Sequence, residues 1–249
     1  MMLDGPYPVR FDGPCPICEA VVPFVVWGSD FRNQFLCEGC RDYSVPRERA
    51  LARVVKRLFP DWRDRAIHET SPVDRGFSAQ MKRSCAGYVA TQFYPGEPLG
   101  IVVGAFRNEN IERSTFPDET FDIVVSQDVL EHVDDFAAAI RDTMRTVRPG
   151  GAHVFTTPTM LLATTVQWAT YVDGRIRWFF EPEYHGNPID ESGSPVTWHY
   201  GYDLPDLIHR RTGFAVEVAR IHDPASGIAG PMNEVYVVRK PADRGSTGG

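Results

Sequence analysis

Four of the five cysteines stand in two Cys-x-x-Cys pairs, a spacing that could hold a metal ion. The pairs are Cys15 with Cys18 and Cys37 with Cys40, and eighteen residues separate them. In a zinc ribbon each such pair supplies two thiolates, and the four complete a tetrahedral site. Because that site has no open coordination position, we predict a structural zinc. Two disulfides or a redox dithiol are the alternatives. The residues at the start of the sequence do not resemble a secretory signal, which argues against disulfides. A redox dithiol needs only one Cys-x-x-Cys pair, whereas this sequence has two.

Titratable side chains near the ends of expected strands could move a proton. An imidazole that is neutral near pH 7 can accept a proton from a hydroxyl nucleophile. The candidate catalytic bases are Asp128, His132, His185 and His199. A structural hydrogen bond is the alternative for His132, and a turn cap is the alternative for Asp128. The aromatic-rich segment that holds His185 and His199 has no His-x-x-x-His spacing, so no second metal is predicted.

A β-α-β unit is expected to position His132 and Asp128. Residues 121–126 form an apolar run typical of a buried strand, and apolar side chains then recur at helical spacing over residues 136–147. An Arg-Pro-Gly-Gly stop and a second apolar run at 152–157 follow. This pattern predicts a parallel sheet in an α/β fold with a ligand crevice at the strand ends.

Elements on either side of this unit complete the expected domain. A helix should begin with Ser44 as its N-cap and Pro46 in its first turn, and its apolar face should join the ribbon to the main domain. Arg47 and Arg49 on this helix could contact substrate phosphates or form a solvated face. A helix at 203–211 and two alternating runs near the end of the chain predict a terminal antiparallel hairpin.

Composition fits a single enzyme-sized unit. The 249 residues are 43% hydrophobic and carry a formal net charge of −7, which argues against a nucleic-acid partner because phosphate binding needs a basic face. No apolar run approaches the roughly 18 residues of a membrane span, and we expect a cytoplasmic protein. The predicted divisions are a ribbon at 1–45, a main domain at 46–240 and a disordered tail at 241–249.

Residues 116–158 carry a family resemblance. They include FPDETFDIVV, QDVLEHV and VRPGG, and resemble the second half of the class I S-adenosylmethionine (SAM)-dependent methyltransferase domain. The resemblance implies a doubly wound, mostly parallel, seven-stranded Rossmann-like sheet with SAM as cofactor.

The same resemblance implies which residues line the cofactor. Glu69 matches the acid after the first strand, but the Gly-x-Gly that normally follows is replaced by Thr-Ser-Pro-Val-Asp-Arg before Gly76. Gln92 stands where a carboxylate usually binds the ribose, and Asn110 stands at the adenine position. An amide can still exchange hydrogen bonds with a ribose. The predicted cofactor-binding residues are Glu69, Ser71, Gln92, Asn110, Ile111, Gln127 and Val129.

A wider set of motifs over residues 12–240 resembles a zinc-ribbon subfamily of methyltransferase-like proteins. The motifs are the cysteine pairs, SVPRERAL, HETSP, TQFYP, RNENIE and YHGNP. Members of that subfamily commonly accompany glycan-biosynthesis enzymes. The resemblance implies methyl transfer from SAM to a small-molecule or carbohydrate acceptor. A catalytically inactive binding protein in glycan assembly and an RNA methyltransferase are the alternatives.

Overall fold

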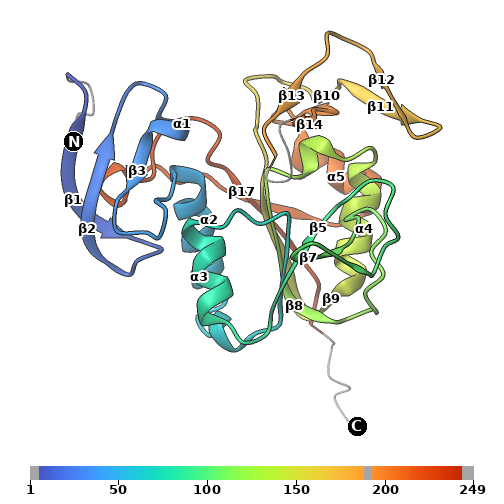
Figure 1. The fold of residues 1–249 in the computed structure, drawn as a ribbon, viewed down its shortest axis with the longest axis horizontal. Coiled ribbons are helices and arrows are strands. Elements are labelled where there is room, and N and C mark those ends of the chain that lie inside the picture. The colour runs from blue at the N-terminus through green and yellow to red at the C-terminus, as the bar shows by residue number, and fades with distance from the viewer. Residues whose placement is uncertain (1–5, 188–191, 243–249) are drawn as a thin grey trace.

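The computed structural model describes residues 6–187 and 192–242, so most of the tail expected at 241–249 lies outside the described residues. The elements form layers (Figure 1). An N-terminal three-stranded sheet is followed by helices α2 (Pro46–Leu58) and α3 (Gly76–Ser84), then by the central sheet, and then by α4 (Phe136–Thr146) and α5 (Leu204–Thr212). Short strands after β9 gather at one end of the central sheet (Figure 1).

The central sheet has eight strands in the order β16-β17-β9-β8-β4-β5-β7-β6. Strands β9, β8, β4, β5 and β7 are mutually parallel, while β17 is antiparallel to β9 and β6 to β7. The predicted doubly wound sheet is confirmed, with one strand more than the predicted seven. The extra strand arises because the chain reverses at Gly104, whose φ is +61°, and pairs with β7 at the edge. The strands are β4 (Ile67–Thr70), β5 (Tyr88–Gln92), β6 (Val102–Val103), β7 (Phe106–Asn108), β8 (Phe121–Gln127), β9 (Val147–Thr156), β16 (Val216–Ala219) and β17 (Val235–Arg239).

The unit β8-α4-β9 agrees with the predicted β-α-β unit except at the start of β9. Asp135 caps α4, because its carboxylate accepts hydrogen bonds from the backbone amides of Ala137 and Ala138. Val147 and the Arg-Pro-Gly-Gly sequence, predicted as helix end and stop, already belong to β9. The extra residues bulge from β9, where the step from Val147 to Ala152 faces the step from Phe121 to Ile123 of β8, and a side chain at Gly151 would collide with the carbonyl oxygen of Asp122.

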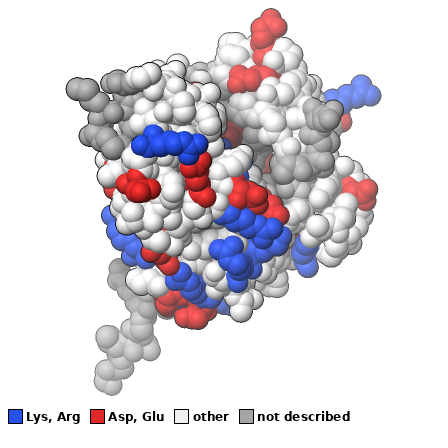
Figure 2. All heavy atoms as spheres, turned by 60° about the vertical axis from the view of Figure 1, so that its left-hand side comes forward, with Lys and Arg blue, Asp and Glu red and all other residues white. Residues whose placement is uncertain are grey.

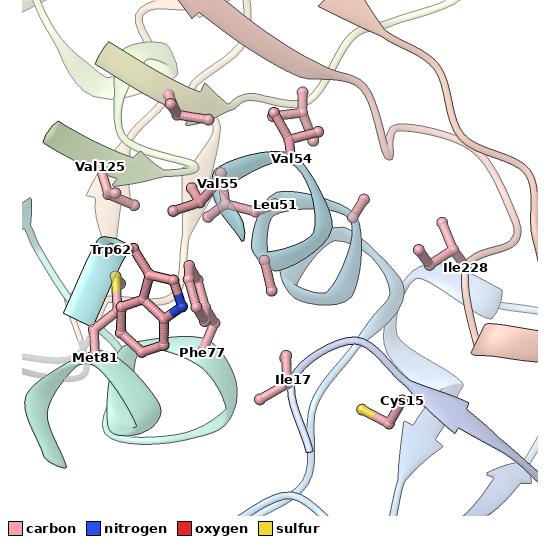
Figure 3. Close-up of a cluster of buried hydrophobic side chains, with 14 of the residues drawn as sticks. Cys15, Ile17, Leu51, Val54, Val55, Trp62, Phe77, Met81, Val125 and Ile228 are labelled. Atoms are coloured by element: carbon pink, nitrogen blue, oxygen red, sulfur yellow. The ribbon is translucent and has the colours of Figure 1, made fainter. Parts of the chain in front are cut away.

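The N-terminal sheet consists of β1 (Val9–Cys15), β2 (Ala20–Val26) and β3 (Phe35–Cys37), with the one-turn helix α1 (Phe31–Gln34) before β3. Its apolar side chains and those of the main domain form one buried cluster. Figure 3 shows Leu51 and Val55 of α2 between Val125 of the central sheet and Ile17 of the N-terminal segment. Burial of this shared surface stabilises the contact between the two sheets.

Helix α2 begins one residue later than predicted and carries a buried arginine. Val45 is the N-cap, and its amide hydrogen-bonds to the carboxylate of Glu48, so the prediction of Ser44 as N-cap was wrong. Arg49 is fully buried and donates to the carbonyl oxygens of Phe35 and Gly227 at 2.8 Å each. Neither prediction for Arg49, a phosphate contact or a solvated position, agrees with this burial.

The C-terminal elements were predicted correctly. Helix α5 ends at Gly213 with φ +81°, where glycine avoids the strain of the left-handed conformation, and β16 and β17 form the antiparallel hairpin. The connection between them contains the 3₁₀ helix η3 (Pro224–Ser226) and returns to the N-terminal sheet. A side chain at Gly13 of β1 would collide with the carbonyl oxygen of Ala225.

The segment between β9 and α5, here called the lid, is built from short antiparallel pairs. The pairs are β10 (Val166–Gln167) with β15 (Trp198–His199), β11 (Ala169–Val172) with β12 (Arg175–Trp178), and β13 (Tyr184–His185) with β14 (Ser194–Pro195). The remaining 3₁₀ helices are η1 (Trp62–Asp64) and η2 (Leu130–His132). None of the helices in the described ranges is long and apolar enough to cross a membrane.

Candidate functional site

The four paired cysteines converge at one end of the N-terminal sheet. Cys15 ends β1 and Cys37 ends β3, while Cys18 and Cys40 lie in the turns that follow. The Sγ atoms are 3.8 Å apart between Cys15 and Cys40, 3.8 Å between Cys18 and Cys37, and 3.3 Å between Cys18 and Cys40. All four are free thiols, so the disulfide alternative does not describe this structure.

These sulfur positions fit a tetrahedral zinc ion. Zinc–sulfur bonds of about 2.3 Å place the sulfurs of such a site roughly 3.8 Å apart. The Cys18 amide lies 3.5 Å from Cys15 Sγ, and hydrogen bonds from Cys18, Cys37 and Cys40 hold the pKa of the Cys15 thiol well below its usual value. A soft four-sulfur donor set with no other ligand suits zinc as a structural ion.

Glu69 lies in a closed hydrogen-bond network at the end of β4. It is fully buried, and its carboxylate accepts from Ser78 Oγ at 2.6 Å, Tyr88 Oη at 2.6 Å and Gln127 Nε2 at 2.8 Å. Burial raises the pKa of Glu69 to about 7 despite these donors. Two predicted cofactor-binding residues, Glu69 and Gln127, therefore bond to each other.

Three neighbouring strands end with polar atoms that lack a partner. Thr70, Gln92 and Gln127 are the last residues of β4, β5 and β8, which are adjacent in the sheet. Within the described residues, Thr70 Oγ1, Gln92 Oε1 and Gln127 Oε1 are buried without any hydrogen bond. A buried unsatisfied acceptor costs about 1–3 kcal/mol, so three together at one edge indicate a ligand that donates hydrogen bonds.

The loop after β4 is held by β5 and by helix α2. Ser71 has φ +49° and its amide donates to the carbonyl of Thr91. At the start of α3, Gly76 has φ +53°, and a side chain there would collide with the Glu48 carboxylate of α2. Arg75 bonds to the same carboxylate at 2.9 Å. Ion pairing and packing thus hold this loop, which lacks the Gly-x-Gly turn that the family resemblance would lead one to expect.

The remaining predicted cofactor-binding residues follow β7 and β8. Asn110 is buried and uses Oδ1 to accept from the amide of Glu112, while Ile111 is half-buried against the α4 side of the core. Val129 is half-buried and its carbonyl accepts from the amide of His132.

Asp128 lies in an ion-pair network rather than free at the strand end. Its Oδ2 lies 2.6 Å from Arg32 Nη2 and 2.7 Å from Arg47 Nε, and Oδ1 accepts from Thr156 Oγ1. Burial alone would raise the pKa of Asp128, but Arg47 and Arg32 outweigh it and hold the pKa below its ordinary value. Arg32 belongs to α1, so the N-terminal segment contributes directly to this edge of the central sheet.

The lid brings His185 to the buried carboxylate of Glu131, beside His132 of η2, while His199 pairs with Glu183 of the lid. His132 Nδ1 is 2.8 Å from the carbonyl oxygen of Pro195, as the structural alternative for this residue predicted. Glu183 lies 3.3 Å from His185 Nε2 and 2.8 Å from His199 Nε2. Burial lowers the pKa of His132 to about 4 and raises that of Glu131 to about 8. His132 is therefore neutral at pH 7.

Several residues of this region were not predicted from the sequence. They are Arg32, Thr70, Glu131 and Glu183. Glu131 had a signal, since it stands in the Leu-Glu-His sequence after a buried strand. One hollow of about 660 Å³ lies elsewhere, between the end of α3 and the start of β5, and its lining includes none of the predicted site residues.

Part of the chain matches a known protein family. Residues 80–155, from α3 to the end of β9, match a family model described as a methyltransferase domain. The fold is that of a Rossmann-like methyltransferase. The match covers Gln92 and Gln127 at the ends of β5 and β8 and Asn110 just after β7, and supports the resemblance to a methyltransferase domain. No curated protein matches the chain.

Similar solved structures share low identity with the chain. An SAM-dependent methyltransferase from Mesorhizobium loti is 19% identical, with 76% of this chain and 96% of that chain covered and a TM-score of 0.47. DhpI in complex with S-adenosylhomocysteine (SAH) is 17% identical, with 76% and 83% covered and a TM-score of 0.48. The sugar N-methyltransferase KedS8 from Streptoalloteichus is 13% identical, with 79% and 87% covered and a TM-score of 0.49.

Proposed function

We propose that the protein transfers a methyl group from SAM to a small-molecule or carbohydrate acceptor. The observation that carries this proposal is the row of buried oxygens at Thr70, Gln92 and Gln127, which have no hydrogen bond within the described part of the chain. SAM offers ribose hydroxyls and an ammonium group as donors, so Gln92 would bind the ribose, and Thr70 and Gln127 would bind the methionine end. When bound, SAM supplies a methyl group activated by the positive sulfonium.

The lid suits an acceptor with flat faces and polar edges. Phe179, Phe180 and Tyr184 are about half exposed, at 49%, 49% and 52%. Trp168 stacks on His199 with ring centroids 4.0 Å apart. Sugar rings and aromatic rings pack on such surfaces while polar groups fix their orientation. Asp128, His132, His185 and His199 remain the candidate bases for an acceptor hydroxyl.

The cysteine site is proposed to hold a structural zinc. It is formed by Cys15, Cys18, Cys37 and Cys40, and their four thiolates would fill a tetrahedral coordination sphere. The zinc would stabilise the N-terminal segment, whose helix α1 places Arg32 against Asp128. The ion would thus act on the strand-end region through folding, without taking part in the chemistry.

Titration calorimetry with SAM and SAH tests the proposal. The wild type should bind both, and Gln92→Leu should bind SAH roughly tenfold more weakly, the effect of one neutral hydrogen bond. Gln34→Leu, which removes an exposed amide from α1, is the matched control and should bind as the wild type does. Equal binding by Gln92→Leu and wild type would place the ribose elsewhere.

A binding protein without catalysis is the second candidate. Two observations favour it, the saturation of Glu69 by internal hydrogen bonds and the closed packing of the loop at Gly76. Failure of SAM and SAH to bind at millimolar concentration would support this candidate. An RNA methyltransferase is a weaker alternative, since Lys and Arg are interspersed with Asp and Glu on the face shown in Figure 2.

A further inference from the structure

A second group of metal-binding side chains lies where the lid meets the end of β8. Ligand atoms of Glu131, His132 and His185 all lie within 4.8 Å of one another. Glu131 Oε1 is 3.8 Å from His132 Nε2 and 4.0 Å from His185 Nδ1. Ligands of a tetrahedral ion at about 2.1 Å are separated by roughly 3.4 Å. Binding one ion would therefore shorten the two separations from Glu131 by about half an ångström, and the separation of the two histidine nitrogens, which is at most 4.8 Å, by up to about 1.4 Å.

The partners of both histidines leave the correct nitrogen free for a metal. A carbonyl oxygen only accepts, so His132 Nδ1 must donate to Pro195, and Nε2, which faces Glu131, keeps its lone pair. His185 Nε2 lies 3.3 Å from Glu183 Oε1, which favours the tautomer protonated at Nε2 and leaves the lone pair on Nδ1, 4.0 Å from Glu131. Histidines that bind metals usually donate their other N–H to a carbonyl or a carboxylate.

Glu131 supplies an independent indication of a ligand. Its side chain is only 2% exposed, and Thr157 Oγ1 donates to Oε2 at 3.1 Å. Oε1 is buried, and no group in the described part of the chain hydrogen-bonds to it. The nearest nitrogens, at 3.8 and 4.0 Å, are too distant for hydrogen bonds. A cation between the three side chains would satisfy this oxygen.

We propose that Glu131, His132 and His185 bind a first-row divalent transition metal, with Glu183 orienting His185 from outside. Two imidazoles and one carboxylate favour Zn²⁺, Co²⁺ or Fe²⁺ over Mg²⁺ and Ca²⁺, which prefer oxygen ligands alone. Three protein ligands leave at least one coordination position open, unlike the filled four-cysteine site. The two sites would therefore have different roles.

The role of this metal rests on the proposed methyl transfer. An acceptor hydroxyl that occupies the open position would have its pKa lowered by the ion. Its proton would leave to water, and its oxygen would attack the methyl carbon of SAM. The S–CH₃ bond breaks with its electron pair remaining on sulfur, which gives SAH and a methyl ether. The metal would then perform the task for which the histidines were predicted as bases.

Metal loading of the purified full-length chain tests the site without any methyl acceptor. Elemental analysis after loading with Zn²⁺ and desalting should find two equivalents in the wild type and one in Glu131→Gln and His185→Ala. Glu183→Gln should weaken the second site by roughly 10- to 100-fold. His209→Ala, which removes an exposed histidine of α5, is the matched control and should keep both equivalents.

Co²⁺ loading and Cys15→Ser distinguish the two sites. Cobalt in the second site should show weak visible bands without the intense thiolate charge-transfer absorption, and excess Mg²⁺ should not displace it. Cys15→Ser should lose the thiolate-bound metal and keep the other.

A wild type that holds one equivalent, or a second equivalent that survives in both Glu131→Gln and His185→Ala, would overturn the proposal. SAH titration of the same variants separates the two proposals. SAH binding without a second metal refutes only the metal site, and a second metal without SAH binding refutes only the proposed function.

Discussion

Arg49→Met should weaken the attachment of the N-terminal segment to the rest of the molecule and lower the free energy of unfolding. The buried guanidinium donates to carbonyl oxygens in three parts of the chain, those of Phe35, Ser44 and Gly227, and it also lies 5.2 Å from the Phe24 ring. Burial lowers the pKa of Arg49 to about 10, which leaves it charged at pH 7. Methionine of similar volume removes the donors without opening a large cavity.

The expected loss follows from what each carbonyl retains. The Ser44 carbonyl also accepts from the amide of Cys37 at 3.1 Å and would lose one of two bonds. Phe35 also pairs with Val26 in the sheet. Among the described residues, the Gly227 carbonyl accepts its hydrogen bond from Arg49 and would lose it in the variant. Leaving one carbonyl unsatisfied costs about 1–3 kcal/mol, and each weakened one costs about 0.5–1.5 kcal/mol. Because the desolvation cost of the guanidinium also disappears, we expect a net loss of about 2–4 kcal/mol.

Urea unfolding with zinc present measures this loss, and the same helix provides a control. Arg53 is one turn further along α2, and its partly exposed ion pair with Asp223 at 2.8 Å should contribute no more than about 1 kcal/mol. Arg53→Met should therefore shift the unfolding free energy far less than Arg49→Met. Equal losses in the two variants would refute the reasoning from buried hydrogen bonds.

Three further perturbations test other parts of the account. Cys15→Ser should remove zinc from the ribbon and loosen the N-terminal segment first, which elemental analysis and hydrogen exchange of residues 6–45 would show; retention of the metal contradicts the site. His153 is fully buried, and burial lowers its pKa to about 3, below that of the unfolded chain, so its stabilising effect is present above about pH 6.5 and is lost as the pH falls toward 3. Urea unfolding of His153→Gln should accordingly show a stability slope between pH 6 and 4 that is about 1.4 kcal/mol per pH unit smaller than in the wild type; an unchanged slope would argue against a neutral buried imidazole. Asp128→Asn leaves Arg32 and Arg47 without their carboxylate and should cost about 3 kcal/mol in chemical denaturation, whereas a purely catalytic Asp128 would leave stability unchanged.

The central unit was predictable because its signals are local. The strand at 121–126 follows from a continuous apolar run, and the helix that begins at Phe136 follows from a period of 3.6 residues; a short window contains both signals. Cysteine spacing and the glycine after α5 are equally local, and both agree with the structure. The start of β9 was not predicted, because a Pro-Gly-Gly sequence normally ends an element, and here a register irregularity absorbs it.

Contacts between distant segments could not be predicted from the sequence. Arg49 reaches Gly227, which is 178 positions away, and no pattern within α2 distinguishes it from the exposed Arg57 of the same helix. In the sequence, Thr70 is indistinguishable from any other β-branched residue of a buried strand. The structure shows that its hydroxyl has no hydrogen bond among the residues described. Glu131 and His185 meet only because the lid folds back over η2, so a search for short metal motifs misses them.

A crystal structure of the protein with SAH bound tests the central claim most directly. The account predicts the nucleoside across the ends of β4, β5 and β8, with a ribose hydroxyl within hydrogen-bond distance of Gln92 Oε1 and the amino-acid end near Thr70 and Gln127. The sulfur should point toward Glu131 and the lid. SAH bound at any other surface, or Gln92 Oε1 still unpartnered in the complex, would contradict it.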